Sequence, residues 1–360
     1  MTEQLFDLNI EEVLENWDVT HALREVISNA LDEQALSESR DIAIFKDEDG
    51  AWHVRDYGRG LQIRHFTLRE NPEKLAAGNG VIGKFGVGLK DALATFHRRG
   101  VSVVIRSRHG TYRLRRAEKH SFETIETLHV AYDAAQTGFH GTEFILDGVS
   151  DAEMAAAKAL FLRFNDETVM ETTPYGQILR RQGDVGRVYI LGVLANEEPN
   201  FTFSYNITDL TKAMRDRLNR DRLNVGRTAY APRIKAILTS STNEEVHRSL
   251  MAQVNHRPGD TPCDEVAWID VSQMTLNLMH KSKKVVYFTP EERDNQLDVI
   301  RAALNEGYEP VPVTEKERAR LDDQASSGGP KVWTVTRYFE SYSAGFEYGF
   351  IEREALPPEE

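Results

Sequence analysis

A run of three closely spaced glycines constrains this chain more than any other feature. Residues 83–90 read GKFGVGLK, and apolar residues recur at roughly helical spacing from 89 to 97. Glycine permits close backbone approaches that a side chain would obstruct. At a helix start, unpaired N–H groups and the positive end of the dipole face whatever binds there. Flexible turns and helix caps share this pattern, so the run predicts either a phosphate-binding loop or an ordinary turn before a helix.

Residues 19–36 predict a long amphipathic helix. Apolar side chains recur along one stripe, and Glu25, Asn29 and Asp32 lie at i, i+4 and i+7 on a neighbouring face. A polar stripe of this kind is commonly the solvent-facing side of a helix. The alternative is that the three side chains form part of a binding site.

The segments after this helix predict a sheet with glycine-rich connections. Residues 41–46 and 52–55 form strands around an acidic hairpin turn at 47–50. The second strand runs into Asp56, with Gly58 and Gly60 at alternate positions. Residues 61–82 are polar and irregular, which is typical of a mobile cover. Further antiparallel strands are expected at 101–107, 110–115, 121–131 and 141–146.

Taken together, these motifs resemble the GHKL ATPase superfamily, which includes gyrase B, heat-shock-protein-90 chaperones, MutL and histidine kinases. The resemblance covers roughly residues 5–150 and is closest to the heat-shock-protein-90 type at residues 23–30 (LREVISNA) and 82–88 (IGKFGVG). It implies an α/β (α+β) fold, the two-layer ATP-binding sandwich called the Bergerat fold, over residues 1–150.

The resemblance also implies the chemistry of the helix. Asn29 is expected to bind Mg²⁺ that bridges phosphate oxygens, since Mg²⁺ prefers hard oxygen ligands. Glu25 is expected to act as the catalytic general base on the attacking water. Histidine kinases carry no such glutamate, so Glu25 favours the branch that hydrolyses ATP.

The remaining motifs would bind the nucleotide. By the same resemblance, Asp56 accepts a hydrogen bond from the adenine amino group, with Thr142 supporting that contact and Asp32 framing the adenine or ribose. Gly58 and Gly60 leave room for the flat base. The residues expected around the phosphates are Gly83, Lys84, Phe85, Gly86, Val87 and Gly88. Lys84 and Lys90 would either add positive charge there or be exposed to solvent.

The second half of the chain predicts a transducer or middle-type α/β domain over residues 151–324. A helix is expected at 151–164, and a strand, a helix at 291–307 and another strand form a βαβ unit within 282–313. Residues 325–360 comprise a linker and an aromatic segment, strand-like over 332–351.

One arginine in the second half is a candidate for the catalytic site. The segment 223–227, LNVGR, resembles the chaperone segment whose arginine reaches the γ-phosphate. A cation there stabilises charge on the transferred group. Arg227 is the first choice, ahead of Arg220 and Arg222. The alternative is an arginine-rich surface loop that pairs with carboxylates of this acidic chain.

Composition narrows the classes of partner. The 360 residues carry a net charge of −13, which argues against broad nonspecific binding to nucleic acid or anionic membranes. The arginines between 98 and 116 predict either a local basic patch or a solvated strand face, and the strand face is preferred. A single cysteine, Cys263, excludes an internal disulfide. The acidic N-terminal sequence does not resemble a targeting peptide, so a cytoplasmic protein is expected.

The sequence therefore predicts Mg²⁺-dependent ATP binding and slow hydrolysis in a chaperone-like conformational ATPase. Expected partners are ATP and ADP, a protein client and a second copy in a nucleotide-dependent dimer. The cover before Gly83 is shorter than a typical chaperone lid, and a full C-terminal dimerisation domain does not fit. Two alternatives stay open: a DNA-associated switch like those of topoisomerases or MORC proteins, and a defence or signalling module that senses nucleotide without significant hydrolysis.

Overall fold

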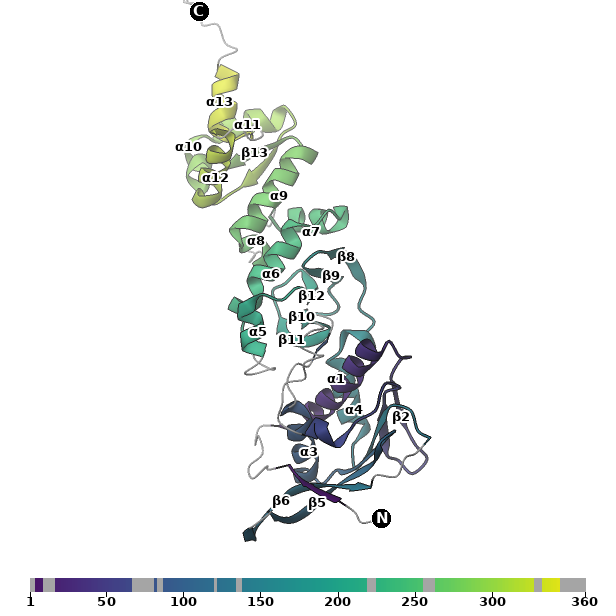
Figure 1. Ribbon diagram of the computed structural model, residues 1–360. Helices are drawn as coiled ribbons and strands as arrows, with labels where there is room; N and C mark the ends of the chain where they lie inside the picture. The colour runs from purple at the N-terminus through teal and green to yellow at the C-terminus, as the bar shows by residue number, and fades with distance from the viewer. Residues whose placement is uncertain are drawn as a thin grey trace, which may run out of the picture. The chain divides into compact units, whose positions relative to one another are not determined.

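The computed structural model describes residues 4–8, 17–66, 81–82, 87–119, 122–133, 138–218, 225–254, 263–326 and 332–343. The chain forms two compact units (Figure 1). Unit 1 contains Met1–Glu198 and Phe203–Ile234, and unit 2 contains Pro199–Thr202 and Lys235–Glu360. The predicted boundary after residue 150 lies within unit 1, and the one after 324 lies within unit 2.

A seven-stranded sheet forms one layer of unit 1. Its strand order is β1-β6-β5-β4-β7-β3-β2, and neighbouring strands run antiparallel. The sheet comprises β1 (Gln4–Asp7), β2 (Ala43–Lys46), β3 (Trp52–Arg55), β4 (Ser102–Ser107), β5 (Gly110–Lys119), β6 (Phe122–Asp133) and β7 (Thr142–Asp147). The predicted hairpin is confirmed by β2 and β3, where Gly50 has φ +91° in the turn.

Helices cover one side of this sheet (Figure 1). They are α1 (Val19–Ser37), α3 (Val87–Arg98) and α4 (Asp151–Ala159), with a short 3₁₀ turn η1 at Ile63–Phe66. Leu23 of α1, Leu93 of α3 and Met154 of α4 are fully buried in one core with Val54 and Leu146 of the sheet. The helix start predicted after the glycine run is confirmed by α3.

Capping groups define the ends of α1. The Asp18 carboxylate accepts a hydrogen bond from the His21 backbone N–H at 3.0 Å, which satisfies one of the first N–H groups of the helix. The helix ends where Glu38 adopts a left-handed conformation with φ +48°, and its N–H donates to the Gln34 carbonyl. These caps fix the register of the polar face between them.

A second sheet of unit 1 has the order β11-β10-β12-β9-β8. Its strands are β8 (Val169–Thr173), β9 (Gly176–Arg180), β10 (Gly186–Ile190), β11 (Val193–Glu198) and β12 (Phe203–Ile207), followed by α5 (Lys212–Leu218) and α6 (Arg227–Thr239). The helix predicted over 151–164 is shorter than expected. It ends at Ala159 because Phe161 turns into the core and pairs with Val193, before the 3₁₀ turn η3 (Leu162–Phe164).

Unit 2 contains helices around a short parallel strand pair. Its elements are α7 (Glu244–Val254), α8 (Asp264–Ala267), α9 (Ile269–Ser282), β13 (Val285–Phe288), α10 (Pro290–Asn295), α11 (Leu297–Asn305), β14 (Glu309–Pro312), α12 (Glu315–Ser326) and α13 (Val335–Ser343). The parallel pairing of β13 with β14 confirms the predicted βαβ unit. Its connection is two helices rather than one, because the backbone breaks at Gln296. With these mixed elements the chain is an α+β protein.

The strand expected over 332–351 is wrong where the structure describes it. Residues 335–343 form α13, and residues 344–351 lie outside the described part of the chain. Val335 and Tyr338 are three residues apart and both buried, which suits one face of a helix. Aromatic content had indicated a strand, but this spacing decided the outcome.

A tight crossing joins the ends of two central strands. Gly141, directly before β7, has φ +85°, and a Cβ added there would lie 2.0 Å from the Asp56 carbonyl oxygen. Backbone therefore passes backbone at a distance that leaves no room for a side chain.

We expect Gly141→Ala to destabilise unit 1 through both its dihedral angle and this overlap. Gly100→Ala is the matched control, since Gly100 has φ +75° and open space around it. The first variant should lose about 2 kcal/mol more unfolding free energy than the second in urea titrations. Equal losses would show that the crossing contributes nothing beyond the dihedral penalty.

Candidate functional site

The polar face of α1 is buried rather than solvated. Glu25 is 2% exposed and Asp32 is 1% exposed, while Asn29 between them is half-buried. Isolated charged groups are costly to bury, so such a face needs partners. The solvent-facing interpretation of this stripe is therefore wrong for its two carboxylates.

Glu25 is paired with its sequence neighbour. Nη2 of Arg24, which is 3% exposed, donates to Oε1 of Glu25 at 2.8 Å. The Arg24 guanidinium carbon also lies 5.8 Å from the Trp17 ring centre. A buried carboxylate next to a buried cation is electrically balanced and held in one orientation. Arg24 is a site residue that sequence reasoning missed.

Asp32 connects α1 to the segment that precedes the glycine run. Its Oδ1 accepts a hydrogen bond from the backbone N–H of Ile82 at 2.5 Å. Ile82 stands one residue before Gly83 in the chain. Asp32 therefore holds the segment before the glycine run against α1. This is a structural role, distinct from the contact with ribose or base expected of this residue.

Asp56 and Thr142 meet where β3 ends and β7 begins. Oδ1 of Asp56 accepts hydrogen bonds from the N–H of Gly58 at 2.9 Å and from the N–H of Thr142 at 3.2 Å. The Asp56 N–H in turn donates to the Thr142 carbonyl at 2.9 Å. Because β3 and β7 are neighbours in the sheet, residues 86 positions apart are brought together.

The environment of Asp56 alters its acid strength. Burial raises the pKa of this carboxyl to about 6, and the like charge of Glu33 adds to the shift, while the hydrogen bonds from Gly58 and Thr142 oppose it. Desolvation disfavours the charged form of an acid, and a nearby carboxylate does the same. A perturbed carboxyl at a strand end is typical of a functional site.

Glu33 and Arg59 form a clamp on the turn after Asp56. Arg59 donates from its backbone N–H at 2.8 Å and from Nε at 2.9 Å to Oε1 of Glu33, and from Nη2 at 2.9 Å to Oε2. Burial opposes ionisation of Glu33, but the hydrogen bonds from Arg59 hold its pKa below the ordinary value. A Cβ at Gly58 would lie 2.4 Å from Cγ of Glu33. Sequence reasoning missed both clamp residues.

The start of the predicted cover is held by several donors. Gly60 has φ +89°, and the N–H of Leu61 donates to Oγ1 of Thr142 at 3.0 Å. The Leu61 carbonyl accepts from Oγ of Ser107 at 2.7 Å and from the hydroxyl of Tyr112 at 3.0 Å. Thr142 thus serves both the Asp56 junction and the beginning of the 61–82 segment.

The glycine run is described only at its end, where it enters α3. Gly83, Lys84, Phe85 and Gly86 lie outside the described residues. Val87 begins α3, and Gly88 follows in its first turn as a buried residue.

Lys90, in the same helix, is buried and contacts a backbone carbonyl rather than solvent. It is 5% exposed, its ammonium donates to the Leu8 carbonyl at 3.1 Å, and burial lowers its pKa.

Arg227 is the first residue of α6. Its Nη1 lies 3.5 Å from Oε2 of Glu198, and the other carboxylate oxygen of Glu198 accepts a hydrogen bond from the Tyr230 hydroxyl. Pairing with a carboxylate is the alternative that the sequence left open for this arginine. Arg220 and Arg222 lie outside the described residues.

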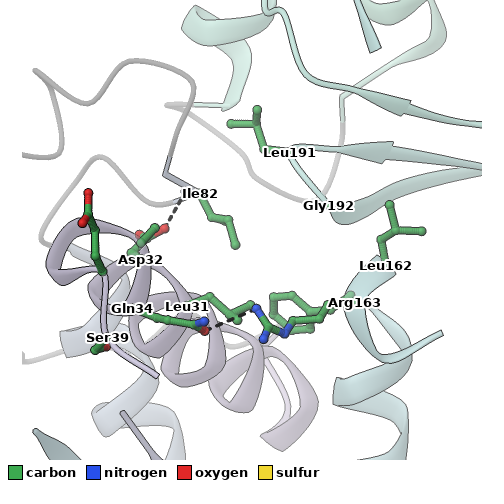
Figure 2. A pocket seen from close by; sticks show the side chains of 12 residues that line it. Leu31, Asp32, Gln34, Ser39, Ile82, Leu162, Arg163, Leu191 and Gly192 are labelled. Carbon is green, nitrogen blue, oxygen red and sulfur yellow. Dashed lines mark hydrogen bonds between the residues drawn. The ribbon is translucent and has the colours of Figure 1, made fainter. Parts of the chain in front are cut away.

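A pocket of about 580 Å³ lies beside this site in unit 1 (Figure 2). Figure 2 shows the Asp32–Ile82 hydrogen bond on one wall and the contact from Arg163 to Gln34 at 3.3 Å on another. Neither Asp56 nor Thr142 lines it. The lining residues are Leu31, Asp32, Gln34, Ala35, Glu38, Ser39, Ile82, Phe161, Leu162, Arg163, Leu191 and Gly192.

Comparison with known proteins relates the chain to mycoplasma sequences. A family model described as the Mycoplasma pneumoniae MPN635 N-terminal domain matches residues 152–244. An "Uncharacterized protein" of Mycoplasma pneumoniae is 32% identical over 243 residues, covering 66% of this chain and 98% of that protein. A second protein with the same description and organism is 26% identical over 137 residues, 37% of this chain and 38% of that protein.

The helices carry no membrane-spanning segment within the ranges given above. None of those described combines the length and the apolar character needed to cross a bilayer.

The raised pKa of Asp56 predicts how stability depends on pH. Because the folded pKa lies above the ordinary 3.8, the ionised form costs stability above about pH 6, and this cost disappears as the pH falls toward 4. Asp56→Asn removes the charge while keeping an oxygen that can accept the two N–H groups. We expect its unfolding free energy at pH 8 to exceed that of the wild type by up to about 3 kcal/mol.

Urea unfolding between pH 5 and 8 measures this difference. Asp151→Asn is the control, since hydrogen bonding to Lys46 lowers the pKa of Asp151 and removing that charge should give no gain as the pH rises. A pH-independent difference between Asp56→Asn and the wild type would contradict the assignment.

Proposed function

The chain belongs to the same family as the Mycoplasma pneumoniae protein that it covers almost completely, and for it we propose Mg²⁺-dependent ATP binding with slow hydrolysis. We further propose that the seven-stranded sheet and its helices form a GHKL-type, Bergerat ATP-binding fold. The proposal depends on the resemblance of the four sequence motifs to that superfamily.

One observation carries the proposal: the Asp56–Thr142 junction. Two motifs that are far apart in the sequence meet there, at the end of β3, through one backbone–backbone hydrogen bond and one from the Thr142 N–H to the Asp56 carboxylate. A carboxylate with raised pKa at this junction is suited to accept a hydrogen bond from an exocyclic amino group. Adenine presents such a donor, whereas guanine presents a carbonyl at the corresponding position. Gly58 and Gly60 keep the adjoining backbone free of side chains.

The buried face of α1 supplies the groups for hydrolysis. Glu25 would take the proton from the attacking water, and its contact with Arg24 holds the carboxylate in place. Asn29, one turn later, offers an amide oxygen suited to Mg²⁺. Among the described residues, no three His, Cys, Asp or Glu side chains are grouped as metal ligands. The ion would therefore arrive with the nucleotide and take its other ligands from phosphate oxygens and water.

Most of the residues proposed to contact the phosphates lie outside the described part of the chain. The glycine run from Gly83 to Gly88 would wrap the phosphates, with Lys84 adding charge. Arg227 would stabilise charge on the γ-phosphate, and it would have to exchange its present contact with Glu198 for the nucleotide. Lys90 is assigned no role, because its ammonium contacts the Leu8 carbonyl.

The biological class that fits best is a chaperone-like conformational ATPase in the cytoplasm. Slow turnover follows if hydrolysis waits for a conformational step. Residues 67–80 of the expected cover lie outside the described part of the chain. Such a cycle would act on a protein client or partner, with a second copy joining in the nucleotide-bound state.

A DNA-associated ATP switch is the second candidate. It is favoured by arginines that project from neighbouring strands: Arg106, Arg113, Arg115 and Arg116 are all exposed on β4 and β5. The net charge of −13 opposes it. ATPase assays with and without DNA and unfolded protein separate the two classes. DNA binding that weakens as salt rises would favour the switch, and tight ATP binding without phosphate release would favour a nucleotide sensor.

We expect Glu25→Gln to retain ATP binding and lose hydrolysis. Glutamine preserves an oxygen for the Arg24 contact, so folding should survive, but an amide cannot accept the proton from water. The turnover number should fall by about 100-fold or more, measured by phosphate release. Glu38→Gln, which alters an exposed carboxylate just beyond α1, should leave turnover unchanged. Wild-type turnover in Glu25→Gln would remove Glu25 from the role of base.

Asp56→Asn should lose nucleotide affinity even though it gains stability. The amide presents N–H groups toward the adenine amino group, so an attraction becomes a clash of donors. A loss of about tenfold or more in ATP affinity is expected by calorimetry. Since the same variant should unfold less readily than the wild type at pH 8, weaker binding could not be attributed to misfolding. Unchanged affinity would exclude Asp56 from the base site.

A further inference from the structure

The contacts around Asp56 indicate a role for Glu33, a side chain that belongs to none of the nucleotide-binding motifs. Glu33 lies on α1 one residue after Asp32, and its carboxylate receives three hydrogen bonds from Arg59. Arg59 stands between Gly58 and Gly60, inside the turn that follows Asp56. The helix is therefore tied to this turn through a single charged pair.

Two consecutive N–H groups of the turn are used by two different carboxylates. The N–H of Gly58 donates to Asp56 at 2.9 Å, and the N–H of Arg59 donates to Glu33 at 2.8 Å. The backbone conformation of the turn satisfies both bonds at once. That conformation places the Asp56 carboxylate against the start of β7, where it also receives the Thr142 N–H.

Steric contact reinforces the tie. A Cβ at Gly58 would overlap the Glu33 side chain, so the turn lies directly on that side chain. Glu33 is 22% exposed and Arg59 is 50% exposed, so the guanidinium covers the carboxylate from the solvent side. A bidentate arginine–carboxylate pair combines strength with a fixed geometry.

We propose that Glu33 is a positioning residue for nucleotide recognition, which fixes the 56–60 turn through Arg59 so that Asp56 faces the base. This inference rests on the proposed ATP site and names a residue that acts on affinity. Glu33 does not act on the chemical step, since the hydrolytic groups Glu25 and Asn29 lie two and one helical turns earlier on α1. Disturbing the clamp should therefore change binding and leave the turnover number alone.

The test compares Glu33→Gln, Arg59→Ala and the double variant with the wild-type chain. Calorimetry with Mg²⁺ and ATP gives the affinity, and phosphate release gives kcat and KM. Each single variant should lose about tenfold in ATP affinity, because each breaks hydrogen bonds to a charged group. The double variant should lose about the same tenfold, since both residues serve one contact. The turnover number at saturating ATP should stay within about twofold of wild type, because the groups that perform the hydrolysis are intact.

A matched control separates the positioning role of Glu33 from the effect of losing an ion pair elsewhere in the chain. Glu309→Gln removes the Lys283–Glu309 pair, which has a separation of 2.9 Å and lies in unit 2. It should keep wild-type affinity, and its thermal midpoint sets the tolerance for accepting the Glu33→Gln variant as folded.

Several outcomes would overturn the proposal. Affinity in Glu33→Gln equal to that in Glu309→Gln would show that the clamp does not position Asp56. A fall in kcat at unchanged KM would place Glu33 in the chemistry instead, and multiplied losses in the double variant would separate the two residues. If the wild type itself bound no ATP, the proposed function and this inference would both fail, which the wild-type titration reveals before any variant is compared.

Discussion

The junction between β3, the turn that follows it and β7 depends on the hydrogen bonds that the buried Asp56 carboxyl group accepts. Asp56 stands where β3 stops and accepts N–H groups from its own turn and from the start of β7. Those bonds compensate only part of the cost of burial, since the pKa remains raised. The close packing around Asp56 requires glycine at two neighbouring positions. Gly141 lets the backbone pass, and Gly58 lets the Glu33 side chain lie against the turn.

The groups that we propose for binding and for reaction lie on different parts of the fold. Asp56 directly follows β3 and Thr142 begins β7, so their separation is fixed by the register of these two strands. Glu25 and Asn29 lie on a helix whose caps fix its register independently. Asp32, through the Ile82 N–H, and Glu33, through Arg59, join the helix to two of the connecting segments. Two acidic side chains in succession on α1 therefore help to hold these segments against the helix.

Local sequence patterns predicted the elements well and the long-range contacts poorly. The first long helix, the β2–β3 hairpin, the start of α3 and the parallel β13–β14 pair follow from periodicity and turn residues. The Glu33–Arg59 clamp could not be found this way, because it joins residues 26 positions apart through side chains. Its one signal was an arginine between two glycines. Lys90 was misjudged because a lysine's burial depends on a distant acceptor, here the Leu8 carbonyl. For residues 335–343, aromatic composition suggested a strand. The three-residue spacing of the buried Val335 and Tyr338 is instead that of a helix face, and the segment folds as α13.

The contribution of α4 to the core limits where this chain can be divided into separately folding pieces. The matched family domain begins at residue 152, near the start of α4. Yet Met154, Ala157 and Phe161 are buried in the same core as Leu23 of α1. The start of the family match therefore falls within the core of the first sheet, about one helix before that core ends. A fragment cut at residue 150 would carry the complete first sheet but expose the apolar surface that α4 covers. Recombination of this module between proteins would have to preserve that helix or replace its buried face.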